Sequence, residues 1–493
     1  MLPSQEKFIL SQYTGLYDLI IPQDNPLRQI KDLVDFSFVY QELKKNYCTD
    51  NGATAESPIR MFKYLFLKRF YDLSDRGVTE RAMYDMSFKY FLDLAPEAQV
   101  IDYSTLSVFR RKRLKNMDLL DILIKKTVKM AVDKGLIKSR TIIIDATHTT
   151  SRSNPIPALD YLRLRSKQLR KNIYSVCKDV DKVKLEMPEK NDTDDIKKEI
   201  DYSNMLADYV EKDPTLLSSP AVNEELNKLK ETIDDIEDHF TISADKDARV
   251  GHKSSEDSFL GYKTHLAMTD ERIITAATVT SGEKPDGPEL KGLVEKSREN
   301  LGGTDKVDTV LADGAYSGND NLKLAHDKES GFELISRTNP MLHKGENREE
   351  DGFELNKDAG MYTCPAGHLA KSKRILHFKE KGKGNDRISF MFDPEKCKVC
   401  KLKDTCMKPG AKTRTYSISI KTDDQKQQME FEKTDAFKAK ARQRYKIEAK
   451  NAELKNIYGY DTAISYGLHN MQLQGAMTIF VANIMRIVRM TKK

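Results

Sequence analysis

Two short apolar runs along the chain each end in an aspartate. Thr141 and the isoleucines at 142–144 run directly into Asp145, and residues 307–312 lead in the same way into Asp313. A short continuous apolar run is typical of a buried central strand. The pattern therefore predicts two inner strands, each with a carboxylate where the strand emerges into solvent.

Further strand patterns lie between these two runs. Residues 259–268 and 273–280 are rich in β-prone residues, and the polar segment 269–272 between them suits a hairpin turn. Helical spacing follows at 285–301, and another helix is expected from Asn319 before a last strand at 332–335. This order predicts an α/β fold with a hairpin followed by parallel strands.

The first 140 residues lack strand patterns and are predicted to be helical. Ser57-Pro58 places a capping residue before proline at the first position of a helix. A later helix from Ser104 is strongly basic, because residues 101–140 hold eleven Lys or Arg against four Asp or Glu. We interpret 1–140 as a DNA-binding domain of the helix-turn-helix type, with a basic run that contacts DNA through Arg110, Arg111, Lys112 and Arg113. The alternative is that this run is only a solvated helix face.

Two segments interrupt the α/β pattern. Residues 152–240 are charged and helix-like, so we interpret them as a helical insertion, with a simple spacer as the alternative. Residues 340–430 are rich in Lys and Gly and hold four of the six cysteines. A long helix is then expected from 432 to 458, with Gly459 as its stop, and a last apolar helix over 468–488.

The overall composition predicts a water-soluble protein of several domains. The chain has 493 residues and a net charge of +6, which is mild for a nucleic-acid binder, but residues 431–460 form a second basic region. Residues 1–7 lack the pattern of a signal peptide, and the apolar stretch 476–490 contains two arginines, so we expect no membrane span. Six cysteines in so long a chain fit a reducing cytosol, and we expect a cytoplasmic location.

A third acid, Glu448, lies within the second basic region. Arg444 precedes it by four residues and Lys455 follows by seven, so all three share one helical stripe. We interpret Asp145, Asp313 and Glu448 as ligands of two Mg²⁺ ions, with Mn²⁺ as a substitute, because these ions prefer hard oxygen donors and a metal pair serves phosphodiester chemistry. Arg444 and Lys455 would then hold a phosphate backbone. The alternative is an exposed helix with an ordinary ion pair between Arg444 and Glu448.

Four cysteines form a candidate zinc site. Cys397 and Cys400 have the C-x2-C spacing that suits tetrahedral zinc, and Cys364 and Cys406 would complete a four-thiolate site. His368 is an alternative ligand, and reduced thiols without a metal are the alternative state. Four thiolates leave no open position, so a zinc ion here would be structural.

Other polar residues compete for roles in the site. Asp245 and Asp247 precede the second strand instead of ending an inner one, so we interpret them as structural. For His148, His252 and His265, ordinary hydrogen-bonded positions are favoured over roles as ligands or bases.

Several short motifs, in order, resemble the DDE transposases of bacterial insertion sequences, and most closely the insertion-sequence family eleven-eighty-two. The resemblance covers nearly the whole chain. The matching stretches are 104–110 (STLSVFR), 144–148 (IDATH), 245–249 (DKDAR), 261–266 (GYKTHL), 312–316 (ADGAY) and 444–455 (RYKIEAKNAELK). The related signature around the third acid is Tyr, Arg, Glu and Lys; Arg444, Glu448 and Lys455 match it, whereas Ala441 stands at the Tyr position.

This resemblance implies an RNase H-like catalytic core in which Asp145, Asp313 and Glu448 are the acidic triad. The implied layout is a core of 141–151, 241–339 and 431–493, with the N-terminal domain 1–140, the helical insertion 152–240 and the Cys-bearing insertion 340–430. The implied activity is metal-dependent cleavage of insertion-sequence ends and strand transfer into target DNA. Its partners would be double-stranded DNA, as terminal inverted repeats and target, and further copies of the chain in a dimer or larger assembly near the bacterial nucleoid. A nuclease of the same fold without strand transfer, and a non-catalytic DNA-binding protein, are the alternatives.

Overall fold

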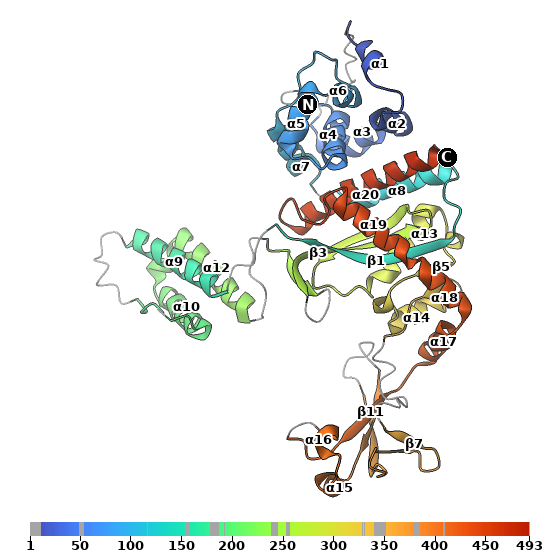
Figure 1. Ribbon diagram of the computed structural model, residues 1–493. Helices are drawn as coiled ribbons and strands as arrows, with labels where there is room; N and C mark the ends of the chain where they lie inside the picture. Colours follow the sequence, from blue (N-terminus) through green and yellow to red (C-terminus); the bar gives the residue numbers. More distant parts are fainter. Residues whose placement is uncertain are drawn as a thin grey trace.

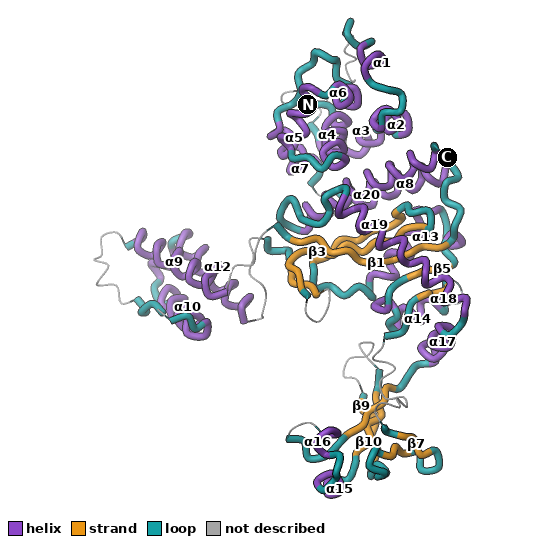
Figure 2. Tube along the Cα trace, in the orientation of Figure 1, coloured by secondary structure: helices purple, strands orange, loops and turns teal. Residues whose placement is uncertain are grey.

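A computed structural model gives the arrangement of the chain (Figure 1). It describes residues 11–48, 54–115, 117–152, 158–177, 187–191, 193–237, 245–252, 257–327, 329, 331–339, 352–377, 385–407 and 410–492. The expectation about a signal peptide, at 1–7, lies outside these residues. Figure 2 shows a central body of strands and helices, with a helical group above it, a second helical group to one side and a small group of strands below it.

The N-terminal segment is helical, as predicted. Its helix α4 (Pro58–Phe70) begins at Ser57, whose hydroxyl accepts a hydrogen bond from the Arg60 amide, and has Pro58 in its first turn. The buried Phe62 and Phe66 of α4 pack against Phe480 of the last helix. The other elements of this segment are α1 (Leu16–Ile20), α2 (Pro26–Leu33), α3 (Ser37–Leu43), η1 (Lys44–Asn46), α5 (Asp75–Tyr84), α6 (Met86–Phe91), α7 (Tyr103–Arg113) and α8 (Leu119–Asp133).

A six-stranded mixed sheet forms the centre of the molecule. Strand β1 lies between β3, its antiparallel neighbour, and β5, its parallel neighbour; β5 in turn pairs in parallel with β6. Strands β2 and β4 both pair antiparallel with β3, and β3–β4 is the predicted hairpin. The strands are β1 (Thr141–Thr150), β2 (Arg249–His252), β3 (Ser258–Thr269), β4 (Ile274–Ser281), β5 (Thr309–Leu311) and β6 (Glu333–Ile335).

Strand β1 is longer than the sequence indicated. It continues for five residues past Asp145 to Thr150, so the prediction that Asp145 ends the strand is wrong. The apolar run 142–144 is fully buried, as predicted. Antiparallel pairing continues up to the pair Thr150–Gly261, which holds the polar half of β1 in the sheet.

Helices α8, α13 (Glu289–Leu301) and α20 (Leu468–Thr491) cover the sheet (Figure 1). The buried Asn483 of α20 accepts a hydrogen bond from the Ile274 amide and donates to the Ile274 carbonyl and to Thr127 of α8. Helix α20 is long and apolar enough to cross a membrane, but 83% of its most apolar window is buried inside the protein. That burial is the arrangement of a core helix, as the sequence indicated.

Residues between β1 and β2 form a separate helical group with its own apolar core (Figure 1). It consists of α9 (Ala158–Val176), α10 (Ile196–Glu211), α11 (Pro214–Ser218) and α12 (Pro220–Glu237). Leu169, Leu206 and Leu229, from three different helices, are fully buried in this core. The regularly spaced apolar residues of this part of the sequence therefore pack against one another within this helical group.

Residues between β6 and α17 contain most of the remaining strands. A three-stranded antiparallel sheet has the order β11-β10-β9, and β7 pairs with β8. The elements are β7 (Glu354–Asn356), β8 (Met361–Thr363), β9 (Ser372–Leu376), β10 (Arg387–Met391), α15 (Pro394–Lys398), α16 (Lys403–Cys406) and β11 (Thr415–Ser419). The rest of the interval predicted as a Cys-bearing insertion includes residues outside the described part.

The chain returns to the central sheet through three successive helices. The prediction of one helix over 432–458 is wrong, because α17 (Asp423–Glu432) ends before Thr434 caps α18 (Asp435–Ala441). The 3₁₀ turn η6 (Arg442–Arg444) then leads into α19 (Tyr445–Asn456), and Gly459 takes the left-handed φ of +60° just beyond it. The remaining elements are η3 (Thr304–Lys306), η4 (Gly314–Tyr316) and α14 (Asn319–Ala325).

Candidate active site

The strand register brings Asp145 and Asp313 together. Ile143 of β1 pairs with Leu311 of β5 in a parallel register, and each aspartate lies two residues beyond its member of that pair. Side chains two residues apart on a strand share a face, and neighbouring strands are about 4.8 Å apart. The two carboxylates therefore lie side by side on one face of the sheet, at the carboxyl end of β5.

Helix α19 brings the third acid to this place. Glu448 lies in its first turn, and Arg444 bridges Glu448 and Asp145, with Nη2 3.0 Å from Glu448 Oε1 and Nη1 3.7 Å from Asp145 Oδ1. One turn further, Asn451 donates a hydrogen bond of 3.1 Å to Asp145 Oδ2. Lys455 Nζ lies 3.3 Å from His148 Nε2 of β1. These contacts show that the predicted stripe faces β1, and Figure 1 shows that α19 lies across the central sheet.

Sequence reasoning missed Asn451. This residue follows Glu448 by three positions and Arg444 by seven, so it shares their stripe, and that spacing was available in the sequence. An asparagine amide gives no indication by itself of which acid it contacts.

Electrostatics set Asp145 apart from ordinary aspartates. Burial raises the pKa of Asp145 to about 6; the Arg444 guanidinium lowers it, and the carboxylates of Asp313 and Glu448 raise it further. The carboxylates of Asp313 and Glu448 therefore lie within electrostatic range of Asp145. Burial disfavours the charged form of the Asp145 carboxyl unless a cation is near.

The donor set suits a divalent ion. Three carboxylates offer hard oxygens and a net negative charge, which Mg²⁺ prefers, and a cation would relieve the raised pKa of Asp145. In the part of the chain that the structure describes, no group of three or more His, Cys, Asp or Glu side chains is arranged so that it could hold a metal. Arg444 contacts two of the acids instead, so the side chains would rearrange when an ion binds.

A buried polar cluster borders the two aspartates. Tyr316 is fully buried, and its hydroxyl has no hydrogen-bond partner among the described residues. Burial raises the pKa of Tyr316 most, and the negative charges of Asp286, Asp145 and Asp313 raise it further. Lys263 Nζ is 3.0 Å from Asp286 Oδ1. Burial lowers the pKa of His265 to about 4, with Asp286 opposing this shift, so this histidine is neutral near pH 7.

Asp245 and Asp247 hold other parts of the chain together. Asp245 is buried and accepts hydrogen bonds from the Tyr262 hydroxyl (2.6 Å), the Ser151 hydroxyl (3.2 Å) and the Gly467 amide (3.0 Å). Asp247 accepts a hydrogen bond from the amide of Leu468, the first residue of α20. These contacts agree with the structural role that the sequence suggested for both residues.

An Asp245→Ala variant is expected to lose about 3 kcal/mol of folding free energy, because the Tyr262 hydroxyl and the Gly467 amide would stay without their partner. Thermal unfolding should show a lower midpoint by several degrees. Asp247→Ala is the matched control and should cost about 1 kcal/mol, as for a lost helix cap. A stable Asp245→Ala protein without catalytic activity would instead mark Asp245 as part of the active site.

The basic run on α7 divides into two pairs. Arg110 donates a 2.9 Å hydrogen bond to Asp75 of α5, which also contacts Lys68. Arg113 donates to the Asn46 carbonyl, and its guanidinium stacks 4.2 Å above the Tyr47 ring. Arg111 and Lys112 are exposed. Two of the four predicted DNA contacts are thus engaged within the protein, and two face solvent.

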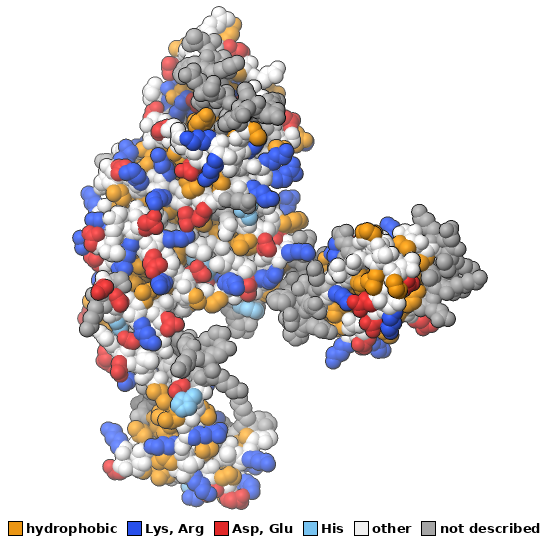
Figure 3. Space-filling view, turned by 180° about the vertical axis from the view of Figure 1, so that it is seen from behind, with side chains coloured by type: hydrophobic (Ala, Val, Ile, Leu, Met, Phe, Trp, Pro, Cys, Tyr) orange, Lys and Arg blue, Asp and Glu red, His pale blue; other side chains and the backbone are white. Residues whose placement is uncertain are grey.

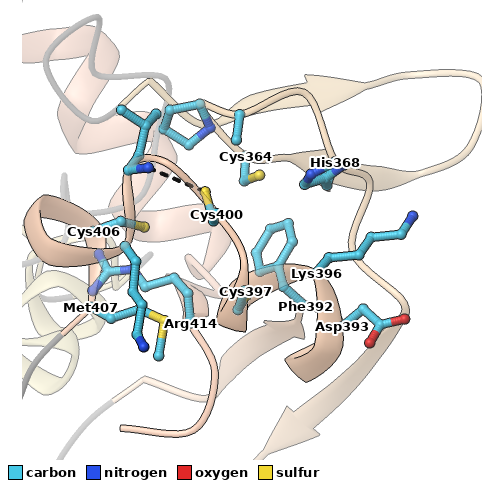
Figure 4. A pocket seen from close by; sticks show the side chains of 14 residues that line it. Cys364, His368, Phe392, Asp393, Lys396, Cys397, Cys400, Cys406, Met407 and Arg414 are labelled. Carbon is cyan, nitrogen blue, oxygen red and sulfur yellow. Dashed lines mark hydrogen bonds between the residues drawn. The ribbon is translucent and has the colours of Figure 1, made fainter. Parts of the chain in front are cut away.

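The four candidate zinc ligands line one small cavity of about 30 Å³, with His368 at its edge (Figure 4). Burial raises the pKa of the Cys406 thiol; Arg414 opposes this shift, and the thiols of Cys364, Cys397 and Cys400 add to it. The four thiols therefore lie within electrostatic range of one another. The cysteines outside this group, Cys48 and Cys177, lie in other parts of the fold.

Comparison with known proteins gives two family matches in separate parts of the chain. The family described as "Transposase domain (DUF772)" matches residues 16–112, and the family described as "Transposase DDE domain" matches residues 363–488. The second match contains Arg444, Glu448 and Lys455. No curated protein matches the chain.

One solved structure is similar over most of the chain. It is titled a cryo-EM structure of the piggyBac transposase synaptic complex with hairpin DNA, and the match covers 94% of this chain and 72% of that chain at 8% identity. Its TM-score is 0.31, a value too low to add weight to the assignment.

Both family matches are to transposase domains, at 16–112 and 363–488, and they support a DDE-type transposase. The protein is a DDE transposase, an enzyme of DNA cleavage and strand transfer, and its DDE domain implies dependence on a divalent metal ion.

Proposed function

We propose that Asp145, Asp313 and Glu448 are the catalytic acids of this transposase and the ligands of two Mg²⁺ ions, with Mn²⁺ as a substitute. The observation that carries this proposal is the parallel register of β1 and β5, which aligns the two aspartates beneath the helix of Glu448. The central sheet would be an RNase H-like core built from 141–151, 241–339 and 431–493. The resemblance to insertion-sequence family eleven-eighty-two belongs to the same proposal.

The neighbouring side chains would orient the acids and the DNA. Asn451 holds one oxygen of Asp145, so that its other oxygen faces Arg444. Bound divalent ions would supply charge stabilisation for the attacking and leaving oxygens. Arg444 would then turn from the acids to a DNA phosphate, with which a guanidinium forms bidentate hydrogen bonds, and Lys455 would add a second cation on the same stripe.

The reaction would consist of two displacements at phosphorus. In the first, a water oxygen attacks a phosphodiester at the end of the element, the bond from phosphorus to the 3′-oxygen breaks, and the leaving oxygen takes up a proton. In the second, the freed 3′-hydroxyl attacks a phosphodiester of target DNA, forms a new bond to phosphorus and releases a target 3′-hydroxyl. The number of phosphodiester bonds is unchanged in the second step, so no external energy source is needed.

A strand-transfer assay with Mg²⁺ tests this function. Incubation of the protein with DNA that carries the ends of its element, and with a plasmid target, should give joined products. Cut ends without joining would indicate a nuclease, and binding without cutting would indicate a regulator; either result would contradict the proposal.

The N-terminal segment 1–140 is proposed to recognise the terminal inverted repeats through α7. Ser104, Ser107, Val108 and Arg111 follow helical spacing, and all four are exposed on one face of α7. Arg76 stacks on Tyr103 at the start of this face. A polar, basic helix face of this kind fits the major groove, whereas the engaged Arg110 and Arg113 would support the helix from behind.

The engaged pair (Arg110 and Arg113) and the exposed pair (Arg111 and Lys112) on α7 predict different mutant behaviour. Arg111→Ala should lower the slope of log affinity against log salt by about one, because one phosphate or base contact is lost. Arg110→Ala should leave the salt slope unchanged and lower the thermal midpoint, since Asp75 would lose one of its two cationic partners and keep only Lys68. Fluorescence anisotropy at several salt concentrations, with thermal unfolding in parallel, measures both. Equal salt slopes for Arg111→Ala and the wild type would exclude α7 from the DNA interface.

A structural zinc ion is proposed in the Cys-bearing insertion, 340–430, with Cys364, Cys397, Cys400 and Cys406 as ligands. The support is the clustering of four thiols around one cavity and the C-x2-C spacing of two of them. The zinc would hold β8, α15 and α16 together and take no part in catalysis.

The assembly and location complete the proposal. A transposase that joins two ends of one element needs both ends at once, so we propose a dimer or larger assembly on DNA. Helices α9 to α12 of the helical insertion share their own apolar core and form a group beside the central sheet, and we propose that this group takes part in such contacts. We also propose a bacterial cytoplasmic, nucleoid-associated location, because the proposed substrate is DNA.

A further inference from the structure

A basic groove runs along the edge of the sheet beside Asp313. It is a cavity of about 970 Å³ between the ends of β5 and β6 on one side and α17, α18 and η6 on the other. Asp313 and Arg444 are both part of its lining, so the groove reaches the proposed catalytic acids. Its cationic side chains are Arg337, Lys433, Lys438, Arg442 and Arg444.

Positive charge dominates this groove. Its lining contains two acids, Asp313 and Glu432, and Glu432 already accepts a 2.6 Å hydrogen bond from the Thr338 amide. Lys433 and Lys438 pair with Glu430 and Asp435 on the same helical turn, at 2.6 and 3.4 Å. Exposed ion pairs of this kind are weak, so each lysine can readily exchange its carboxylate partner for a stronger anion.

Arg337 and Arg442 have no intramolecular partner within the described part of the chain. Both are exposed, and they approach the groove from opposite sides, Arg337 just after β6 and Arg442 at the start of η6. Two guanidinium groups without carboxylates, on facing walls, suit phosphate oxygens, which they bind in a bidentate way. The larger apolar side chains of the lining are Leu311, Ile335, Met429 and Phe437.

We propose that this groove binds the DNA backbone that flanks the reacting phosphodiester, with Arg337 and Arg442 as its phosphate contacts. The proposal rests on the proposed catalytic role of Asp313, because the groove is assigned to flanking DNA on the ground that Asp313 is part of its lining. Continuity with the acids and charge complementarity favour DNA over a protein partner. Seen from behind in Figure 3, the surface of the main body carries Lys and Arg side chains interspersed with Asp and Glu side chains, without one large area of a single charge.

The salt dependence of DNA binding tests the groove. The full-length Arg337→Gln/Arg442→Gln protein should bind a short fluorescein-labelled DNA duplex of random sequence with a salt slope lower by about two, since each lost phosphate contact lowers the slope by about 0.9. Each single variant should give about half that change. Lys129→Gln/Lys291→Gln is the control, because both lysines are exposed, at 72% and 65%, on α8 and α13 outside the groove.

The outcomes separate this proposal from the catalytic one. An unchanged slope in the arginine variants, or an equal fall in the lysine control, overturns the groove. Arg337→Lys/Arg442→Lys keeps both charges and should retain most of the wild-type slope; a full loss there would point to altered folding, which thermal unfolding would reveal. If Asp313→Asn cleaves DNA normally while the arginine variants lose their slope, the catalytic assignment fails and the DNA groove stands.

Discussion

An Asp313→Asn variant is expected to lose DNA cleavage by at least about 1000-fold, or about 4 kcal/mol of barrier, while its affinity for DNA stays the same. The change would remove one proposed charged metal ligand from a site where charge stabilisation of the reacting oxygens is worth several kcal/mol. The fold should survive, because Asp313 Oδ1 accepts a hydrogen bond from the Ala315 amide, and the Asn carbonyl oxygen can accept the same bond. Cleavage of end-labelled DNA and anisotropy measure the two properties.

Asp308→Asn is the matched control for this experiment. Asp308 precedes β5 at the other end of the strand, is 54% exposed and pairs with Arg140. It should therefore cleave DNA at the wild-type rate. Equal cleavage by Asp313→Asn and Asp308→Asn would refute the carboxylate triad, whatever the DNA affinity of either protein.

Much of the geometry of the proposed catalytic site was predictable because it depends on local spacing. The stripe of Arg444, Glu448 and Lys455 follows from helical periodicity alone, and its orientation toward β1 agrees with that prediction. The convergence of the two aspartates required a parallel register, which two similar apolar runs suggested and β1–β5 pairing provides. These parts of the site are encoded within short segments.

Other features depend on contacts between distant segments, which spacing does not reveal. Arg110 and Arg113 belong to one basic run, yet Asp75 and the Asn46 carbonyl engage them from other elements. In the same way, β1 continues past Asp145 because β3 offers partners up to Gly261. Charge and apolarity along a single segment cannot identify such partners.

The prediction of one continuous helix before α19 was wrong, although the sequence contained a local signal for the break. Thr434 accepts a hydrogen bond from the Phe437 amide and starts α18, so a capping residue was present in the middle of the predicted helix. The break has a consequence for function, since it turns α18 and η6 so that Lys438 and Arg442 line the basic groove. The groove could not be predicted from the sequence as long as this segment was taken to be one straight helix.

Removal of the proposed zinc ion is expected to unfold the Cys-bearing insertion. Among the residues that the structure describes, the apolar core of the insertion consists of Phe353, Tyr362, Ala370, Phe390, Phe392 and Tyr416. Six buried residues are too few to stabilise an independent unit of this size without a further cross-link. Structural zinc contributes an apparent free energy of about 10 to 16 kcal/mol in small domains, which is larger than such a core supplies. The stability of the insertion should therefore depend on the metal.

A Cys397→Ser/Cys400→Ser variant should lose its zinc, from about one ion per chain to nearly none by elemental analysis. Limited proteolysis should then cut within 352–407, while the central sheet stays protected because its core is separate. Cys48→Ser/Cys177→Ser is the matched control, with two thiols removed outside the cluster, and should keep both zinc and protease resistance. If the wild-type protein contains no zinc and its insertion still resists proteolysis, the four thiols are not metal ligands. The small aromatic core would then stabilise this part of the fold alone. In that core the rings of Phe353 and Tyr416 stack with their centroids 4.4 Å apart.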